Sequence, residues 1–148
     1  MIRGLHVLDG TDYTSQITVR HMLTHASALP DWLEEAPPGG KSVVETVLEE
    51  GDRALSFEEV VRIVSNDLKP HFPPQDMSGG RARIRYSDTN FILLIWIIER
   101  VTGQPLHEVH RELLHEPLGM RQTYFPGSSE PLEPTPAAMP LLADGEPV

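Results

Sequence analysis

The sequence contains no cysteine and few basic residues. Without cysteine the chain can form neither disulfides nor thiolate metal sites, although this absence does not identify a compartment. Lys and Arg number 12 against 22 Asp and Glu, which gives a formal net charge of -10. Nucleic acids and anionic membrane surfaces attract clustered Lys and Arg, so we expect neither as a partner.

We expect neither a secretion leader nor a membrane-spanning run in this sequence. Met1 is not followed by a charged and then apolar stretch, so we expect no secretion signal in this chain. The longest apolar run, residues 91–98, is far shorter than the roughly 20 residues that cross a bilayer. We therefore expect no membrane span, and the 148 residues could bury one hydrophobic core.

Residues 81–103, RARIRYSDTNFILLIWIIERVTG, join an expected strand to an expected helix. Three arginines alternate with Ala82, Ile84 and Tyr86, which is the two-residue period of a short strand. The apolar run and Gly103 then predict a buried helix that is covered on all sides and ends at a C′ glycine. Ser87, Asp88 and Thr89 are residue types that accept hydrogen bonds at a helix start.

Local spacing alone does not make the Tyr86-Ser87-Asp88 corner, where the expected strand meets the helix, an active site. A tyrosine before a buried helix is usually a packing residue, and Ser-Asp-Thr is usually a cap. The same holds for His21 and His25, whose four-residue spacing is that of a zinc pair on a helix beginning after Thr18. The catalytic Glu of zinc proteases is absent and no third ligand is marked, so we expect packing or capping histidines and no metal.

Other segments predict ordinary helices and turns. Residues 1–16 indicate an extended segment with a tight turn at Asp9-Gly10. Capping boxes at Ser42 and Ser56 predict two short helices, the first ending at Gly51. The acidic pairs, including Glu34-Glu35, are expected to be solvated. The second of these helices should direct five residues inward: Phe57, Val60, Val61, Val64 and Leu68.

The C-terminal third predicts one more helix and then an unstructured tail. Pro105 begins a helix whose inward residues are expected to be Leu106, Val109, Leu113 and Leu114, with His107, His110 and His115 at the surface. Residues 117–120 predict a turn, and residues 122–125 the start of a strand. Residues 126–148 contain six prolines and four acidic residues but no basic ones, so we expect a loop or disordered tail.

Two blocks resemble the serine β-lactamase and penicillin-binding protein superfamily, in particular its class C-like esterase and D-alanyl-D-alanine carboxypeptidase branch. The segment YSDTNFILLIWIIERVTGQPLHEVHRELLHEPLGMRQTYF is similar to a family stretch in which Tyr-Ser-Asn opens a buried helix ending in Thr-Gly. The block ITVRHMLTHASALPDW is similar to the family stretch ending in His-Thr-Ser-Gly-Leu-Pro. Ala26 and Ala28 stand where the family has Thr and Gly, and alanine suits the backbone geometry of that glycine poorly.

The resemblance implies a mainly α fold with short strands, the helical portion of a β-lactamase/transpeptidase-like α/β sandwich. Residues 1–125 would be the central part of the domain. The family acylates a serine in an S-x-x-K turn, uses a Tyr or Ser motif for proton transfer and contacts substrate through a K-T-G-like strand. No serine here precedes lysine by three residues, and Gly39-Gly40-Lys41 continues into Ser-Val-Val. The chain contains no nucleophile in the family's motif.

By the same resemblance Tyr86 would transfer protons, and Ser87 and Asp88 would contact the substrate. Asp88 replaces an Asn and cannot donate a hydrogen bond when ionised, which weakens the case for β-lactam turnover. A phenol with a pKa of about 10 needs a stabilised phenolate to act as a base, to which Arg83 or Arg85 could contribute.

We therefore expect part of a serine hydrolase for a small ester, amide or peptide substrate, without a cofactor and inactive alone. The alternative is a non-catalytic helical binding module on the same scaffold.

Overall fold

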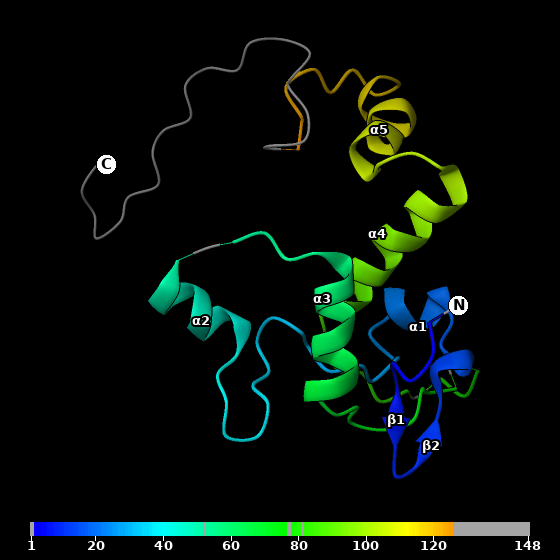
Figure 1. Cartoon of the computed structure of the whole chain (residues 1–148). Helices are drawn as coiled ribbons and strands as arrows, with labels where there is room; N and C mark the ends of the chain where they lie inside the picture. The colour runs from blue at the N-terminus through cyan, green and yellow to red at the C-terminus, as the bar shows by residue number, and fades with distance from the viewer. Residues whose placement is uncertain (1, 52, 77, 81, 126–148) are drawn as a thin grey trace. The chain divides into compact units, whose positions relative to one another are not determined.

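The computed structural model describes residues 2–51, 53–76, 78–80 and 82–125. It divides the chain into two compact units, with the boundary between Ile97 and Ile98. The described part is mostly helical, with one two-stranded sheet (Figure 1). The Pro-rich segment 126–148, for which a loop or disordered tail was expected, lies outside the described residues.

The first unit begins with a tight hairpin. Strand β1 (Val7–Leu8) pairs antiparallel with β2 (Thr11–Asp12), so that Val7 lies opposite Asp12. The two residues between the strands, Asp9 and Gly10, have φ of 48° and 79°. A two-residue hairpin turn with both φ positive matches the right-handed twist of the strands, so the expected turn is confirmed, with extended residues at 7–8 and 11–12. A short 3-10 turn, η1 (Thr14–Gln16), follows.

Three helices of the first unit begin where the sequence predicts. The side chains of Thr18, Ser42 and Ser56 each accept a hydrogen bond from the backbone N–H three residues later, at 3.2 Å in every case. Each cap is reciprocated by the side chain of that later residue. The elements they begin are α1 (Val19–Leu23), α2 (Val43–Glu50) and α3 (Phe57–Arg62), the last continued by the π-helical turn η2 (Ile63–Asp67).

Helix α4 (Thr89–Thr102) is the long apolar helix that the sequence predicts. Gly103 has a φ of 72° and donates its N–H to Glu99 O at 2.8 Å, so the C′ glycine is confirmed. The expectation that the helix is covered on all sides is wrong for this chain. Within the apolar run only Leu93 is buried, the residues at 92 and 94–98 are half-buried, and Phe91 is 44% exposed.

The core of the first unit lies between α1, α3 with η2, and the first half of α4. Complete burial of one large apolar side chain in this core stabilises the fold by about 1.5–3 kcal/mol. Phe57 stacks on Trp96 with ring centroids 5.1 Å apart, which fixes α3 against α4. The buried cluster consists of Leu5, Met22, Leu29, Val60, Val64 and Leu93.

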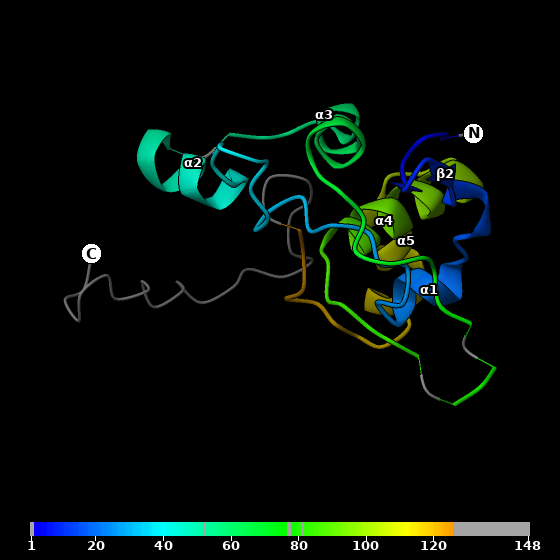
Figure 2. The same ribbon diagram turned by 90° about the horizontal axis from the view of Figure 1, so that it is seen from below.

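A segment without helix or strand connects η2 to α4 and runs beside residues 25–28. His71 donates its N–H to Ala28 O and Gln75 to Ala26 O, both at 3.1 Å, and Arg85 donates to His25 O at 2.9 Å. In Figure 2 this segment, coloured green, passes α1 on its way to α4. The expected loop at 70–80 is confirmed for its described residues, whereas the described part of the expected strand, 82–86, is not a strand. Among the described residues, no strand pairs with 82–86.

The second unit contains α5 (Leu106–His110), which continues into the π-helical turn η3 (Arg111–His115). Val109 is buried as predicted, but Leu113 and Leu114 are 68% and 43% exposed. His115, expected at the surface, is 7% exposed and lies against Phe125, with ring centroids 6.4 Å apart. The reason is the π turn, whose i→i+5 bonds shift the inward face away from positions spaced for an α-helix.

The end of the described second unit contains a turn and no strand. Gly119 has a φ of 64°, and Met120 donates its N–H to His115 O at 2.7 Å, so the predicted turn at 117–120 is confirmed. The described residues 122–125 are not in a strand, contrary to the expectation.

Ala28 is fully buried and has a φ of 61°, as expected from its place in the glycine position. A left-handed backbone costs a non-glycine residue roughly 1–2 kcal/mol. Ala26 is equally buried without a positive φ, so A26G is a matched control for A28G. Both changes remove one methyl group and raise the conformational entropy of the unfolded chain. These two contributions to the free energy of unfolding cancel when the variants are compared. We expect A28G to have a free energy of unfolding about 1–2 kcal/mol above that of A26G in urea titrations. Equal losses would show that Ala28 is unstrained.

His6 makes the stability of the fold depend on pH. Its Nε2–H donates to Phe72 O at 3.0 Å, while Nδ1 is buried without a hydrogen-bond partner. Burial of the ring lowers the pKa of His6 below its ordinary value, although nearby backbone hydrogen bonds partly oppose this shift. As the pH falls through the ordinary value of 6.5, the unfolded chain takes up a proton that the folded chain does not.

We therefore expect the free energy of unfolding to fall as the pH is lowered from about 7 towards 5. His6→Gln keeps an N–H donor but cannot titrate, so this part of the pH dependence should be missing from the variant. Urea titrations of both proteins at several pH values give the comparison. Parallel curves for the two proteins would contradict the assignment to His6.

Candidate active site

Tyr86 stands at the corner that leads into α4. Its side chain is 61% exposed, and its hydroxyl donates a hydrogen bond to Asp88 Oδ1 at 2.6 Å. The phenol and this carboxylate thus form a polar pair at the surface. The two residues that follow Tyr86 in the sequence, Ser87 and Asp88, are held in place by residues of the 25–35 segment.

Ser87 and Thr89 point into the protein from this corner. Ser87 is fully buried, and its hydroxyl donates to Pro30 O at 3.0 Å. Thr89 donates to the same carbonyl at 2.6 Å and accepts the N–H of Trp32 at 3.1 Å. The hydroxyl of Ser87 is therefore already bonded within the protein. The substrate contact predicted for Ser87 stays a prediction.

A buried polar network lies behind the corner. Ser27 donates to Asn90 Oδ1 at 2.6 Å, and both residues are fully buried. Asn90 Nδ2 lies 3.2 Å from both His25 Nδ1 and Ser87 O, and the N–H of Ser87 donates to His25 Nδ1 at 3.3 Å. A backbone N–H can only donate, so His25 Nδ1 is an acceptor and the ring proton is on Nε2.

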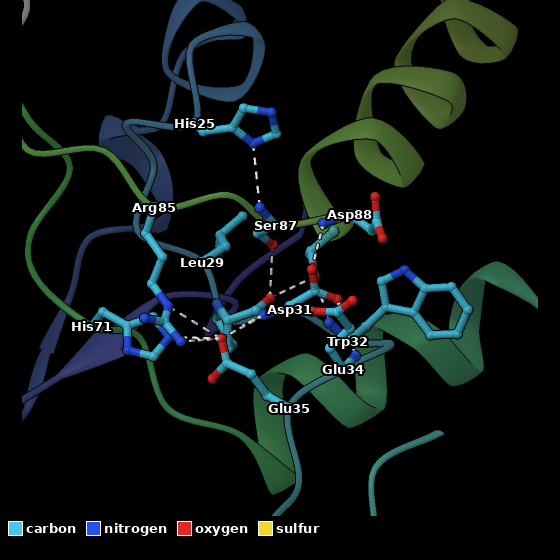
Figure 3. Close-up of polar contacts among 12 residues, drawn as sticks. His25, Leu29, Asp31, Trp32, Glu34, Glu35, His71, Arg85, Ser87 and Asp88 are labelled. Carbon is cyan, nitrogen blue, oxygen red and sulfur yellow. Dashed lines mark hydrogen bonds and ion pairs between the residues drawn. The ribbon is translucent and has the colours of Figure 1, made fainter. Parts of the chain in front are cut away.

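The buried carboxylate of Asp31 accepts hydrogen bonds from two segments, the start of α4 and residues 33–34. It is 4% exposed, and its Oδ2 accepts the N–H of Asp88 at 3.0 Å. Its Oδ1 accepts the N–H groups of Leu33 and Glu34 at 2.9 and 3.3 Å. Figure 3 shows Asp31 between Ser87, Asp88 and the 32–35 segment. The backbone of Asp88 is therefore fixed while its carboxylate faces Tyr86.

Glu35 supports Asp31 from the other side. Its Oε1 accepts the N–H of Asp31 at 3.0 Å and lies 2.8 Å from His71 Nε2 and 3.4 Å from Arg85 Nη2 (Figure 3). The expectation that Glu35 is merely solvated is wrong. His71 and Arg85 lie 36 and 50 residues away in the sequence, so no local pattern could have indicated these contacts.

The electrostatics of Tyr86 disfavour a phenolate in this chain. The hydrogen bond to Asp88, and then the negative charge of Asp88, raise the pKa of Tyr86 above its ordinary value. Burial and the charges of Asp31 and Glu34 act in the same direction. The two described arginines of the predicted strand make other contacts: Arg83 lies 4.4 Å from the centroid of the Phe72 ring, and Arg85 contacts Glu35. Their contribution to a phenolate at Tyr86 stays a prediction.

The described part of the chain contains no group of metal-ligating residues. Across residues 2–51, 53–76, 78–80 and 82–125, no three His, Asp or Glu side chains form a group that could hold a metal ion. His21 accepts the N–H of Thr18 at 3.2 Å and so caps α1, in agreement with the capping interpretation. Within the same ranges no helix has the length and hydropathy of a membrane span.

The sequence and the structure both match the β-lactamase family. The family model described as Beta-lactamase matches residues 6–148, so the chain belongs to this family. Esterase EstB of Burkholderia gladioli is 33% identical over 135 residues, which are 88% of this chain and 30% of the esterase. A putative D-alanyl-D-alanine carboxypeptidase of Escherichia coli is 48% identical over 52 residues, 35% of this chain and 12% of that protein.

Solved structures with similar folds are hydrolases of amides. The D-amino acid amidase of Ochrobactrum anthropi, in complex with L-phenylalanine amide, superposes with a TM-score of 0.58 and 26% identity over 80% of this chain. A D-stereospecific amidohydrolase from Streptomyces gives 0.60 and 29%, also over 80%. This chain covers 28% and 32% of those two structures. The mainly helical fold with a short sheet thus corresponds to part of a β-lactamase-type structure, as the sequence predicted.

The contact between Tyr86 and Asp88 predicts a measurable change in titration. Asp88→Asn removes the charge that raises the pKa of Tyr86, so this pKa should fall in the variant. Glu34→Gln removes a weaker, more remote charge and should shift it less. Tyrosine ring carbons can be followed by NMR across alkaline pH, with Tyr86→Phe identifying the signal. An unchanged midpoint in D88N would contradict the pairing.

Proposed function

We propose that this chain is the central part of a serine hydrolase domain that cleaves an ester, amide or peptide through an acyl-serine intermediate. Tyr86 is the proton-transfer residue in this proposal and Asp88 borders the substrate, whereas Ser87, whose buried hydroxyl bonds to Pro30 O, borders it through its backbone. The observation that carries the proposal is the Tyr86 corner at the start of α4, which donates hydrogen bonds to His25, Pro30 and Asp31 in a chain of this family.

The proposed reaction needs a group that first takes and then returns a proton. A serine oxygen attacks the substrate carbonyl, its proton passes to a base, and the same proton goes to the departing alcohol or amine as the acyl-serine forms. Water then releases the acid by the reverse sequence. The exposed hydroxyl of Tyr86, on a backbone fixed on both sides, is suited to such a transfer.

The protonation state of Tyr86 supports the further proposal that the chain is inactive alone. Its phenol donates to Asp88, and its pKa is raised by that carboxylate. A base near neutral pH requires the opposite shift, which a nearby cation such as the lysine of an S-x-x-K turn would produce. The sequence contains no such turn, so we propose that the nucleophile and its lysine come from outside the sequence given.

The substrate class rests on the relatives and on Asp88. The similar proteins are named as an esterase, a D-amino acid amidase and a carboxypeptidase, which supports a carbonyl substrate with an alcohol or amine leaving group. A carboxylate at position 88 accepts hydrogen bonds but cannot donate them. This supports ester or amide hydrolysis over the turnover of β-lactams.

The alternative function is a non-catalytic binding module that keeps the family scaffold. It is favoured by the raised pKa of Tyr86 and by Asp88 in place of the family's Asn. A native transcript that begins at Met1, together with a cooperative melt of the purified chain, would support this alternative.

Active-site labelling tests whether the chain holds its own nucleophile. Ser27 and Ser87 are fully buried and donate to Asn90 and Pro30, so neither is available for attack. We expect no covalent labelling of the folded chain by a fluorophosphonate or a penicillin probe, measured by intact-mass spectrometry. The heat-denatured chain is the background control. A label on Ser27 or Ser87 would show that the nucleophile is misplaced.

The coding DNA upstream of Met1 tests the fragment proposal directly, because it should contain an in-frame S-x-x-K segment. In the longer protein Tyr86→Phe should lower kcat by about 10²–10⁴-fold, the usual contribution of a proton-transfer group. Tyr124→Phe, at an exposed tyrosine outside the Tyr-Ser-Asp motif, is the matched control. Upstream DNA without an in-frame S-x-x-K segment would contradict the proposal that the chain is part of a serine hydrolase domain.

A further inference from the structure

We propose that His25 is a positioning residue for Tyr86, which it holds through backbone N–H groups on both sides, those of Arg85 and Ser87, and through its ring. This inference rests on the proposed function only in so far as Tyr86 is taken to be the proton-transfer residue. The contacts of His25 with the corner stand independently of that role.

His25 binds the backbone on both sides of Tyr86. Its carbonyl oxygen accepts the N–H of Arg85 at 2.9 Å, and its Nδ1 accepts the N–H of Ser87 at 3.3 Å. The second bond is drawn in Figure 3, where the imidazole points at the backbone of Ser87. One residue therefore anchors the Ile84–Arg85 and Tyr86–Ser87 peptide groups, which limits how the backbone at Tyr86 can move between them.

The imidazole ring also contacts the phenol ring. The ring centroids of His25 and Tyr86 are 4.6 Å apart, with 33° between the planes. Because Tyr86 is 61% exposed, few other contacts define its rotamer. The contact with His25 gives the exposed phenol one preferred direction, towards Asp88.

His25 is itself held in an uncommon conformation. Its φ is 54°, in the left-handed region, which residues other than glycine rarely adopt. Asn90 Nδ2 lies 3.2 Å from its Nδ1, and Asn90 is oriented in turn by Ser27. A side chain that served only for packing would need neither a positive φ nor an Nδ1 that accepts a hydrogen bond.

Two substitutions separate the acceptor from the ring. His25→Asn places a side-chain oxygen close to the position of Nδ1 and tolerates a positive φ, but it removes the ring. His25→Phe keeps a ring and removes the acceptor. His21→Asn is the matched control, because His21 caps α1 and is not in contact with Tyr86.

The experiment is NMR of the isotope-labelled chain, which needs no catalytic activity. In the parent, His25 should show a protonated Nε2 and an unprotonated Nδ1. In H25F the Ser87 amide should exchange with solvent about fivefold faster, as expected for the loss of one neutral hydrogen bond. The amide of Val60, which bonds to Ser56 within the α3 cap, serves as the internal reference. In H25N the Ser87 amide should stay protected while the Tyr86 ring signals move towards those of a free tyrosine.

Each outcome bears on the positioning role alone. A proton on Nδ1 in the parent, or unchanged Ser87 exchange in H25F, would overturn it. Should H25F fail to fold, the parent tautomer and the Tyr86 signals of H25N still decide the matter, and unmoved ring signals in H25N would overturn the ring contact. Failure of the proposed function would appear elsewhere, as full activity of Tyr86→Phe in the longer protein, and would leave these NMR results unchanged.

Discussion

The structure around the corner depends on the need to satisfy buried polar groups where no helix or sheet does so. Residues 25–31 and 87–90 bury hydroxyl, amide and carboxylate groups, and an unpaired group of this kind costs about 1–3 kcal/mol. Pro30 O accepts two hydroxyls, Asp31 accepts three backbone N–H groups, and Asn90 links Ser27 to His25. Each segment thus supplies the partners that the other lacks. The corner is fixed because neither segment can move without leaving such groups unpaired.

The parts of the fold that the sequence predicts are those determined by neighbouring residues. Capping boxes, the Asp9-Gly10 turn and the C′ glycine at position 103 each involve residues within four positions, so their patterns could be read directly. The contacts of Glu35 with His71 and Arg85 span 36 and 50 residues, and no local pattern encodes them. The alternation at 82–86 predicted a strand because it carries the right period, but a strand also needs a partner, which the sequence pattern cannot supply.

The candidate site shows the same division. The Tyr-Ser-Asp motif and the block at 17–32 were found by their resemblance to a family, and the match over residues 6–148 confirms the family. The hydrogen bond from Tyr86 to Asp88 was not anticipated, although Asp88 had been identified as a departure from the family pattern. An amide at this position would accept that bond without a charge, whereas the carboxylate accepts it and raises the pKa of Tyr86. One substitution therefore places a negative charge beside the proposed proton carrier and raises its pKa.

Helix α4 shows why the corner and the rest of the domain can be considered separately. Its residues 92 and 94–98 are only half-buried, and its apolar side near Trp96 and Ile97 borders a cavity of about 300 Å³ within the first unit. Apolar surface left in this state favours contact with further protein, which agrees with the proposal that the chain is part of a larger domain. The hydrogen bonds to His25 and Asp31 are made at the first turn, where Thr89 and Asn90 are fully covered. The geometry of Tyr86 is therefore set locally, while the chemistry proposed for it requires a serine and a lysine that this sequence does not contain in the family's motif.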